Sequence, residues 1–516
     1  MTGRNLAAAL ALAATCVLTA PAAHAEDLVL RVGVGQSDVA NLDPHRATTT
    51  GDVTVASTMF NGLVRFAPGS ANPASIGPDI AESWTSSDDG LVWTFKLRPD
   101  VAFHGGYGTL TADDVVYSLK RAANKDTSSF ANDYLGVADV EAIDDLTVRI
   151  TLDFPIPGFL GILANYHGGN IVSKKAAEEM GDAFNAHPIG TGPFMFDEKV
   201  TQQYVRLVAN KDYFRGAPHI DEIMYRLIPS DSSRRLAFES GELDLIYGKR
   251  EQKWVEAVKE LPNAVVDVFE PGEFRTLHIN MGHGALADRR VRLAIAEAIN
   301  VDELRAFVGD DITRPGCSAV PPGYFGESCE EPYPYDPENA RKLLEEAGLG
   351  DGLKLKVVVS NSSAQQPVME VIQAQLAGAG IDADLEIVDH PTYHQKIRQD
   401  VSDLVFYGAA RFPIADSYLS QFYHSRSTVG TPTAITNFSH CDVADSEIDG
   451  AKVLTTDESR VQLWKEAQDK IHETVCSVPL FSLMQVWVRT DKLDYGFPME
   501  GNLNLSPLIN EQTTLN

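Results

Sequence analysis

Hydrophobic and polar residues alternate along several short stretches of the chain, and this period of two predicts β-strands. Strands are expected at residues 29–34, 93–97, 147–152, 204–208, 223–228, 353–359 and 383–388. Other stretches place apolar residues at helical spacing. They predict helices at 232–240, 288–299, 368–379 and 462–474, and helix starts at the capping residues Thr111 and Asp336. The order of strand, helix and strand in the second half of the chain predicts an α/β fold.

The length of the chain indicates how many domains it contains. A chain of 516 residues exceeds what one hydrophobic core usually serves, so two or three domains are expected. A turn-rich junction at Pro188–Pro193 indicates a crossing between domains, and a second half begins near Leu277. The net charge of −29 repels phosphate backbones, which disfavours nucleic acid as a partner.

The first 25 residues predict a secretory signal peptide. One cation, Arg4, precedes an apolar run at 6–18 that is too short to span a membrane comfortably. Small residues follow at Ala23 and Ala25, the two positions that a signal peptidase reads, so cleavage is expected after Ala25 and the mature protein is expected in the periplasm. Cys16 raises the alternative of a lipoprotein, although its preceding residues are a poor context for lipidation.

Four cysteines remain in the predicted mature chain, and an even number in an exported protein suits disulfides. They are Cys317, Cys329, Cys441 and Cys476. Of the three possible pairings, 317–329 with 441–476 is favoured, because a short Pro- and Gly-containing loop can bring Cys317 and Cys329 together. The chain has no CxxC pair, so a zinc knuckle is unsupported.

Several motifs occur in a fixed order along the mature chain. They lie at Asn41–His45, Ile80–Trp84, Trp93–Arg98, Phe103–Gly106, Leu110–Leu119, Gly190–Phe194, Gly241–Asp244, Asp288–Arg292 and Asp336–Gly348. In this order they resemble the extracytoplasmic solute-binding proteins of ABC importers, in the family that includes oligopeptide-, dipeptide-, nickel- and opine-binding members. A single motif would be weak evidence, but this number in sequence is specific.

The resemblance implies a bilobal periplasmic-binding-protein-like fold, with hinge strands between the lobes and an additional lobe inserted in the N-terminal half. We name the expected parts lobe I (26–65, 188–275 and 485–516), lobe II (66–187) and lobe III (276–484). Closure of the lobes would bury a small solute, peptide-like or carboxylate-bearing, for delivery to an inner-membrane permease. The resemblance also implies a monomer that is not an enzyme and carries no cofactor.

Arg411 is the main candidate for a ligand contact. Peptide-binding members of the family typically carry an acid after the segment at Tyr407, and this chain places Arg411 near that position. A guanidinium donates two parallel hydrogen bonds to a carboxylate or phosphate, so Arg411 is expected to hold an anionic group beside Phe412. The alternative is a conventional peptide binder in which Asp416 pairs with the ligand's amine.

Further candidates are aromatic, basic or histidine side chains at positions that often line the pockets of the family, although each is equally suited to packing. They are His45, Arg46, Tyr166, His167, Arg275, His278, Tyr407 and Trp487. His390 and His394 would suit a metal only in a helix, and Pro391 argues against one. A secreted hydrolase stays a remote alternative, because the chain has no GxSxG, GxGxxG or Walker motif.

Overall fold

The structure, a computed structural model, describes residues 28–329, 332–362, 364–431 and 436–516. The expected signal peptide, its cleavage point and Cys16 lie outside the described residues. The predicted strands and helices agree with the structure within two residues at each end, with one exception. Helix α14 begins five residues earlier than expected and spans Asp457–Thr474, because Thr456 caps it by accepting a hydrogen bond from the Ser459 backbone N–H. Along the described chain, no helix is long and apolar enough to cross a bilayer.

One mixed sheet of nine strands runs through the molecule in the order β16-β12-β17-β11-β1-β10-β9-β8, with β13 beside β17. Its strands are β1 (Val29–Val34), β8 (Phe194–Val200), β9 (Tyr204–Ala209), β10 (Glu222–Leu227), β11 (Leu245–Tyr247), β12 (Ala264–Ile279), β13 (Thr313–Pro315), β16 (Leu404–Ala409) and β17 (Ser477–Thr490). Strand β1 pairs in parallel with β10 and β11. The helices that accompany this part of the chain are α1 (Thr50–Ala56), α5 (Asp231–Glu239) and α6 (Gln252–Lys259).

Two long strands connect the two ends of the molecule. Strands β12 and β17 are antiparallel partners from the pair Ala264–Thr490 to the pair His278–Ser477. Their register shifts twice, between Phe269 and Glu273 and again between Arg275 and Thr276. Strands that are paired on both sides of such irregularities can bend there without separating, so we expect the hinge between lobes I and III at these positions.

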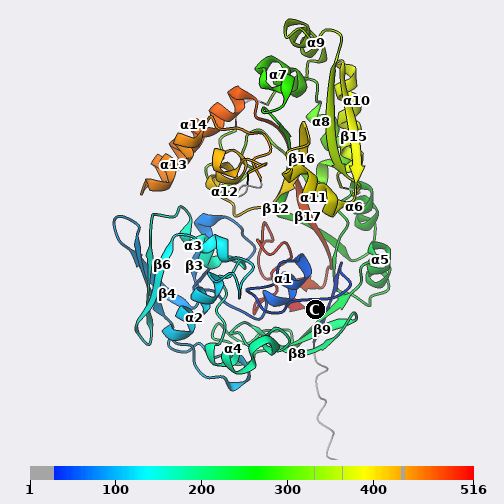
Figure 1. Cartoon of the computed structure of the whole chain (residues 1–516). Helices are drawn as coiled ribbons and strands as arrows, with labels where there is room; N and C mark the ends of the chain where they lie inside the picture. The colour runs from blue at the N-terminus through cyan, green and yellow to red at the C-terminus, as the bar shows by residue number, and fades with distance from the viewer. Residues whose placement is uncertain (1–27, 330–331, 363, 432–435) are drawn as a thin grey trace, which may run out of the picture.

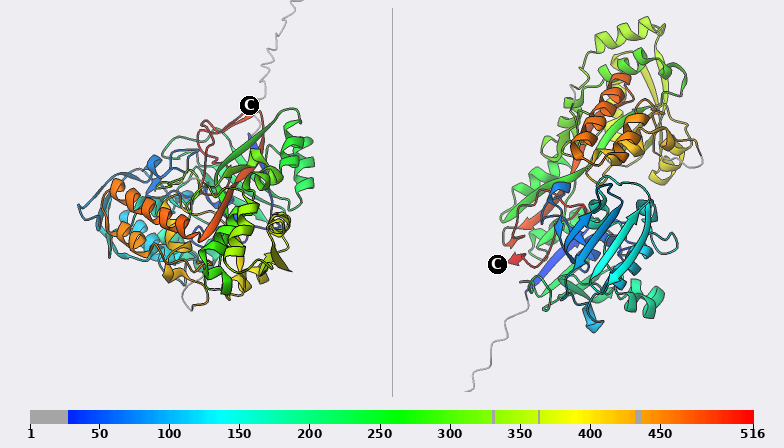
Figure 2. Two further views of the ribbon diagram at one scale, coloured as in Figure 1. Left: turned by 90° about the horizontal axis from the view of Figure 1, so that it is seen from above. Right: turned by 90° about the vertical axis from the view of Figure 1, so that its left-hand side faces the viewer.

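A second, four-stranded antiparallel sheet forms the inserted part of the chain, in the order β4-β5-β7-β6. It consists of β4 (Ala81–Ser86), β5 (Val92–Leu97), β6 (Val137–Asp144) and β7 (Thr147–Leu152), with the helices α2 (Ala112–Ala122), α3 (Phe159–Ala164) and α4 (Lys174–Met180) and the short strands β2 (Val64–Arg65) and β3 (Gly77–Pro78). Its own hydrophobic core includes Phe95, Leu119 and Ile150. Figure 2 shows this sheet next to lobe I and below the helices of lobe III.

Lobe III carries most of the helices (Figure 1). They are α7 (Arg289–Glu297), α8 (Val301–Val308), α9 (Pro337–Glu346), α10 (Gln366–Gly378), α11 (His390–Arg398), α12 (Ala415–Phe422), α13 (Asp445–Val453) and α14, around the parallel strand pair β14 (Leu353–Ser360) and β15 (Ile381–Val388). The predicted disulfides Cys317–Cys329 and Cys441–Cys476 both form within this lobe. A short C-terminal pair, β18 (Leu493–Asp494) and β19 (Thr514–Leu515), closes the chain in lobe I.

Candidate functional site

A cavity of about 560 Å³ lies between lobe II and lobe III. Lobe II lines it with residues 156–158 and 165–167, and lobe III lines it with the segment from Ala410 to Gln421. The remaining wall comes from Pro271 in the hinge and from Leu503 and Leu505 near the C-terminus. All three lobes therefore meet at this cavity, and a solute held there would contact each of them.

Helix α12 turns a polar stripe toward the cavity. The residues Asp416, Ser417, Ser420 and Gln421 line the space. The other side of the helix is buried in lobe III through Ala415, Tyr418, Leu419 and Phe422. Polar residues at i, i+1, i+4 and i+5 share one face of a helix, so the sequence itself aligns these four side chains.

Arg411 enters the cavity wall between β16 and α12. Its Nε donates to Gln421 Oε1 at 2.6 Å, and its Nη1 donates to the Ala410 carbonyl at 2.9 Å. The guanidinium lies 5.6 Å from the centre of the Phe422 ring. Among the described residues, no carboxylate lies within 4.0 Å of Arg411, so the cavity wall carries a fixed positive charge without a counterion.

Asp416 lines the same cavity at the start of α12. Its Oδ1 accepts a hydrogen bond from Ser420 Oγ at 3.3 Å. Burial raises the pKa of the Asp416 carboxyl, and the positive charge of Lys452 opposes that shift only in part. The carboxylate is therefore poorly solvated, and a cationic group of a ligand would stabilise its charged form.

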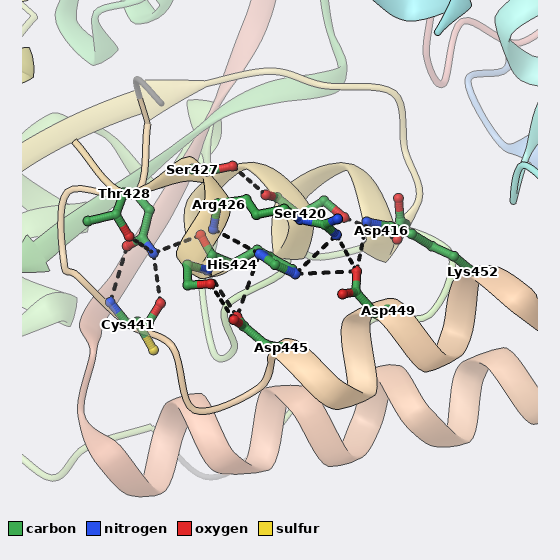
Figure 3. Close-up of polar contacts among 12 residues, drawn as sticks. Asp416, Ser420, His424, Arg426, Ser427, Thr428, Cys441, Asp445, Asp449 and Lys452 are labelled. Atoms are coloured by element: carbon green, nitrogen blue, oxygen red, sulfur yellow. Dashed lines mark hydrogen bonds and ion pairs between the residues drawn. The ribbon is translucent and has the colours of Figure 1, made fainter. Parts of the chain in front are cut away.

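A network of charged side chains joins the end of α12 to α13 (Figure 3). The buried His424 ring accepts a hydrogen bond from the Arg426 backbone N–H at 3.0 Å, and its Nε2 lies 3.3 Å from an Asp449 oxygen. Asp445 accepts a hydrogen bond from the Ser425 backbone N–H at 2.9 Å. These contacts fix α12, and with it the polar stripe, against the body of lobe III.

Phe412 crosses from lobe III into a notch on lobe II. A Cβ atom added to Gly161 in α3 would lie 1.8 Å from Phe412 Cζ, and a Cβ added to Gly158 would lie 3.1 Å from Phe412 Cε1. The ring also contacts Phe66 at 6.2 Å between centroids. We call Gly158 and Gly161 the glycine notch. Only the absence of side chains at these positions admits the Phe412 ring.

Tyr166 and His167 form the lobe II wall that faces Arg411. His167 Nδ1 lies 2.8 Å from Asp133 Oδ2, and its ring stacks on Phe130 at 4.6 Å. Burial raises the pKa of Tyr166 to about 12, while the positive charge of Arg411 acts in the opposite direction. The structure thus brings together five of the residues proposed from the sequence: Arg411, Phe412, Asp416, Tyr166 and His167.

His45 and Arg46 lie outside this cavity. His45 is fully buried between lobes I and II, with Nε2 3.0 Å from the Asn170 carbonyl and Nδ1 2.8 Å from Arg121 Nη1. Burial lowers the pKa of His45 to about 4, so the ring is neutral at pH 7. Arg46 is exposed and donates to the Asp126 carbonyl at 3.3 Å.

The candidates on the long strands pack inside lobes instead of lining the cavity. Arg275 pairs with Glu273 at 2.6 Å. His278 is buried among Phe422, Tyr423 and Phe438, and burial lowers its pKa to about 3. Tyr407 packs on Phe422 and Phe438. Trp487 is 1% exposed, donates to the Leu505 carbonyl at 3.1 Å, and lines a separate cavity of about 260 Å³ in lobe I.

Several cavity residues were not anticipated from the sequence. They include Asp133, Pro271, Ser417, Ser420, Gln421, Leu503 and Leu505. The polar stripe of α12 was visible in the sequence, because Ser417, Ser420 and Gln421 share the helical face of Asp416. Leu503 and Leu505 carried no comparable signal, since they belong to an irregular C-terminal segment.

One sequence argument is wrong. Pro391 does not prevent a helix at His390–His394, because it lies in the first turn of α11, where a proline is tolerated. The two histidine rings consequently meet edge to face, with ring centroids 4.5 Å apart.

Comparisons with known proteins place the chain in a family. The model of the bacterial extracellular solute-binding proteins, family 5 Middle, matches residues 75–429. The chain is 31% identical to di/tripeptide-binding protein 2 of Pseudomonas aeruginosa (strain UCBPP-PA14), over 85% of this chain and 86% of that protein. It is 30% identical to the glutathione-binding protein GsiB of Salmonella paratyphi A (strain ATCC 9150 / SARB42), over 92% of each chain.

Among solved structures, the chain resembles the binding protein MoaA of A. tumefaciens R10 in complex with mannopinic acid. The identity is 46%, the TM-score is 0.81, and the match covers 95% of this chain and 99% of that one. The fold and the family proposed from the sequence are thus confirmed. The chain belongs to the family 5 bacterial extracellular solute-binding proteins and is the substrate-binding component of an ABC importer, not an enzyme.

Proposed function

We propose that the solute is a small, opine-like acid, and that Arg411 binds its carboxylate in the cavity between lobes II and III. The observation that carries this proposal is the guanidinium of Arg411, which lines the cavity and lacks a carboxylate partner among the described residues. Its Nε donates to Gln421 and its Nη1 donates to the Ala410 carbonyl, and these two hydrogen bonds hold the guanidinium in one orientation. The 46% identical relative that was solved with mannopinic acid supports an acid as the solute.

The physical argument rests on desolvation. A carboxylate that enters the cavity loses water, and a bidentate hydrogen bond to a guanidinium compensates for that loss. Removing one partner of such a pair costs roughly 2–5 kcal/mol, which weakens binding about thirtyfold or more. Phe412 and Leu503 offer apolar walls to the rest of the solute.

The test is calorimetric titration of the mature protein with mannopinic acid, glutathione and di- and tripeptides. We expect an acid to bind, Arg411→Gln to lose about thirtyfold or more in affinity, and Arg411→Lys to recover only part of it, because an ammonium lacks the planar fork. Arg46→Gln is the matched control, since Arg46 is exposed and lies outside the cavity. An unchanged affinity in Arg411→Gln contradicts the proposal.

A second candidate anchor follows from the desolvated carboxylate of Asp416. If a peptide amine binds there, Asp416→Asn should weaken peptide binding while Arg411→Gln leaves it unchanged. The two variants therefore separate an acid-binding protein from a conventional peptide binder. The relative of 31% identity, a di/tripeptide-binding protein, makes this comparison necessary.

We further propose that the protein is exported to the periplasm, cleaved after Ala25, and acts as a monomer that delivers its solute to an inner-membrane permease. The predicted lobe boundaries are proposed as the limits of the moving units. Mass spectrometry of the N-terminus of the exported protein tests the cleavage. Light scattering with and without solute tests the monomer.

A further inference from the structure

Helix α11 lies in lobe III (Figure 1). It brings two histidines together that do not line the solute cavity. His390 and His394 are four residues apart on this helix, and their Nε2 atoms lie 3.1 Å from each other. Ser360 Oγ, at the end of β14, lies 2.9 Å from His390 Nδ1 and orients that ring. His390 is exposed and His394 is half-buried, so solvent reaches the pair from the side of His390.

The hydrogen bonds around the pair leave one polar atom unexplained. A neutral imidazole carries one N–H group and one nitrogen lone pair. Either Nε2 atom can therefore donate its N–H to the other. In either case the Nδ1 atom of His394 is buried without a hydrogen-bond partner among the described residues.

When His390 Nδ1–H donates to Ser360, the Nε2 lone pair of His390 points at His394. This is the arrangement in which a histidine ligand is oriented by an outer hydrogen bond. Two nitrogens 3.1 Å apart, each about 2.0–2.1 Å from one ion, subtend an angle of about 95–100° at that ion. Such an angle suits two adjacent positions of a tetrahedral, square-planar or octahedral ion.

We propose that His390 and His394 form a binding site for a late first-row divalent ion, Zn²⁺, Ni²⁺ or Cu²⁺. Imidazole nitrogen is a preferred ligand for these three ions. Water or a small anion occupies the remaining coordination positions, because the described residues place no third histidine, cysteine or carboxylate at the pair. The Arg398 guanidinium donates to the His394 carbonyl at 2.8 Å, and its positive charge opposes the binding of a cation, so coordination by the two imidazoles has to outweigh it.

This site is independent of the proposed solute. Neither histidine lines the 560 Å³ cavity. A second histidine-rich region, around His283, His440 and Asp400, is less suitable, because His283 pairs with Asp403 at 2.9 Å and His440 pairs with Asp400 at 2.9 Å. Those contacts occupy the nitrogens that an ion would require.

The test is calorimetric titration of the mature protein, stripped with EDTA, with Ni²⁺ and Zn²⁺ as their chloride salts. We expect a site of one ion per chain, and at least about tenfold weaker binding in both His390→Gln and His394→Gln. His187→Gln, at an exposed histidine far along the chain, is the matched control and should bind like the wild type. Thermal unfolding in EDTA checks that each variant is folded.

A register variant sharpens the result. The double substitution His394→Gln/Gln395→His keeps the composition but turns the second imidazole about 100° around the helix. Loss of binding in this variant supports the paired geometry. Absence of binding by the wild type up to millimolar metal, or equal binding by the wild type and both single variants, overturns the proposal and leaves an N–H···N hydrogen bond as the role of the pair.

Discussion

The two interfaces of lobe II differ in their chemistry. Toward lobe I, buried charges and histidines join the two parts: Asp43 binds Arg121 at 2.9 and 2.5 Å, and Asp79 binds Arg215 at 2.9 Å. Toward lobe III, the contacts are apolar, chiefly the Phe412 ring in the glycine notch. Among the described residues, no hydrogen bond or ion pair links lobe II to lobe III.

This difference indicates which interface is permanent. Separating lobes I and II would leave buried charges without partners, which is costly. Separating lobes II and III exposes a small apolar surface and a cavity, which costs little and can be compensated by a solute. We therefore expect lobes I and II to move together and lobe III to close against them.

The largest expected effect breaks the permanent interface. Arg121→Met removes the close cation of the buried Asp43 carboxylate and leaves only the exposed Arg46, 3.9 Å away, so the free energy of unfolding should fall by about 3–5 kcal/mol. Urea unfolding measures this. The matched control is Arg149→Ala, whose partner Glu141 is exposed and for which a loss under about 1 kcal/mol is expected. Equal losses in the two variants would contradict the distinction between the interfaces.

The second prediction addresses closure. Gly161→Ala places a Cβ 1.8 Å from the Phe412 ring, and overpacking of this kind costs about 1–3 kcal/mol. Since only the closed state makes this contact, solute affinity should fall roughly 5- to 150-fold, and X-ray scattering should show a more open molecule. Adding Phe412→Ala should restore closure.

The control for the closure experiment is Gly378→Ala in α10. A Cβ at Gly378 meets no atom within 4 Å, so affinity and shape should stay unchanged. A normal affinity in Gly161→Ala would show that Phe412 leaves the notch without cost, and the notch would then have no part in closure.

The third prediction concerns acid. Burial lowers the pKa of His45 to about 4, against an ordinary value of 6.5. Between these values the unfolded chain binds a proton that the folded chain does not, so acidification favours unfolding. His45→Gln should lose about 1–2 kcal/mol less than the wild type between pH 7.0 and pH 5.5. Urea unfolding at both pH values, with the exposed His219→Gln as control, checks this; identical losses would mean that His45 does not report on the interface.

The smallest effect is expected at the movable interface. Tyr166→Phe removes a hydroxyl that lines the cavity. We expect the affinity for the solute to fall by about 0.5–1.5 kcal/mol, the usual contribution of one hydrogen bond, and the stability to stay within about 0.5 kcal/mol. A loss of stability without a loss of affinity would assign Tyr166 to packing within lobe II.

The sequence predicted the elements better than the orientation of single side chains. Alternation identified strands such as β1, β7 and β14, but it did not identify the long strands β12 and β17. It also did not show that His278 faces an aromatic core or that Trp487 packs in lobe I. His45 follows a family motif, yet its ring satisfies a lobe interface instead of a ligand. Arg411 and Asp416 reach the cavity because the end of β16 and the start of α12 lead into it, and the resemblance to the family, not a local pattern, singled them out.

The hinge also bears on how the protein reports what it has bound. Strands β12 and β17 stay hydrogen-bonded on both sides of the two register shifts, at Phe269/Glu273 and Arg275/Thr276, so we expect lobe III to swing about this region without sliding along it. Motion of this kind has one coordinate, the angle between the lobes. A solute too large for about 560 Å³ stops the swing early, so molecular size is converted into an angle that a membrane partner can discriminate.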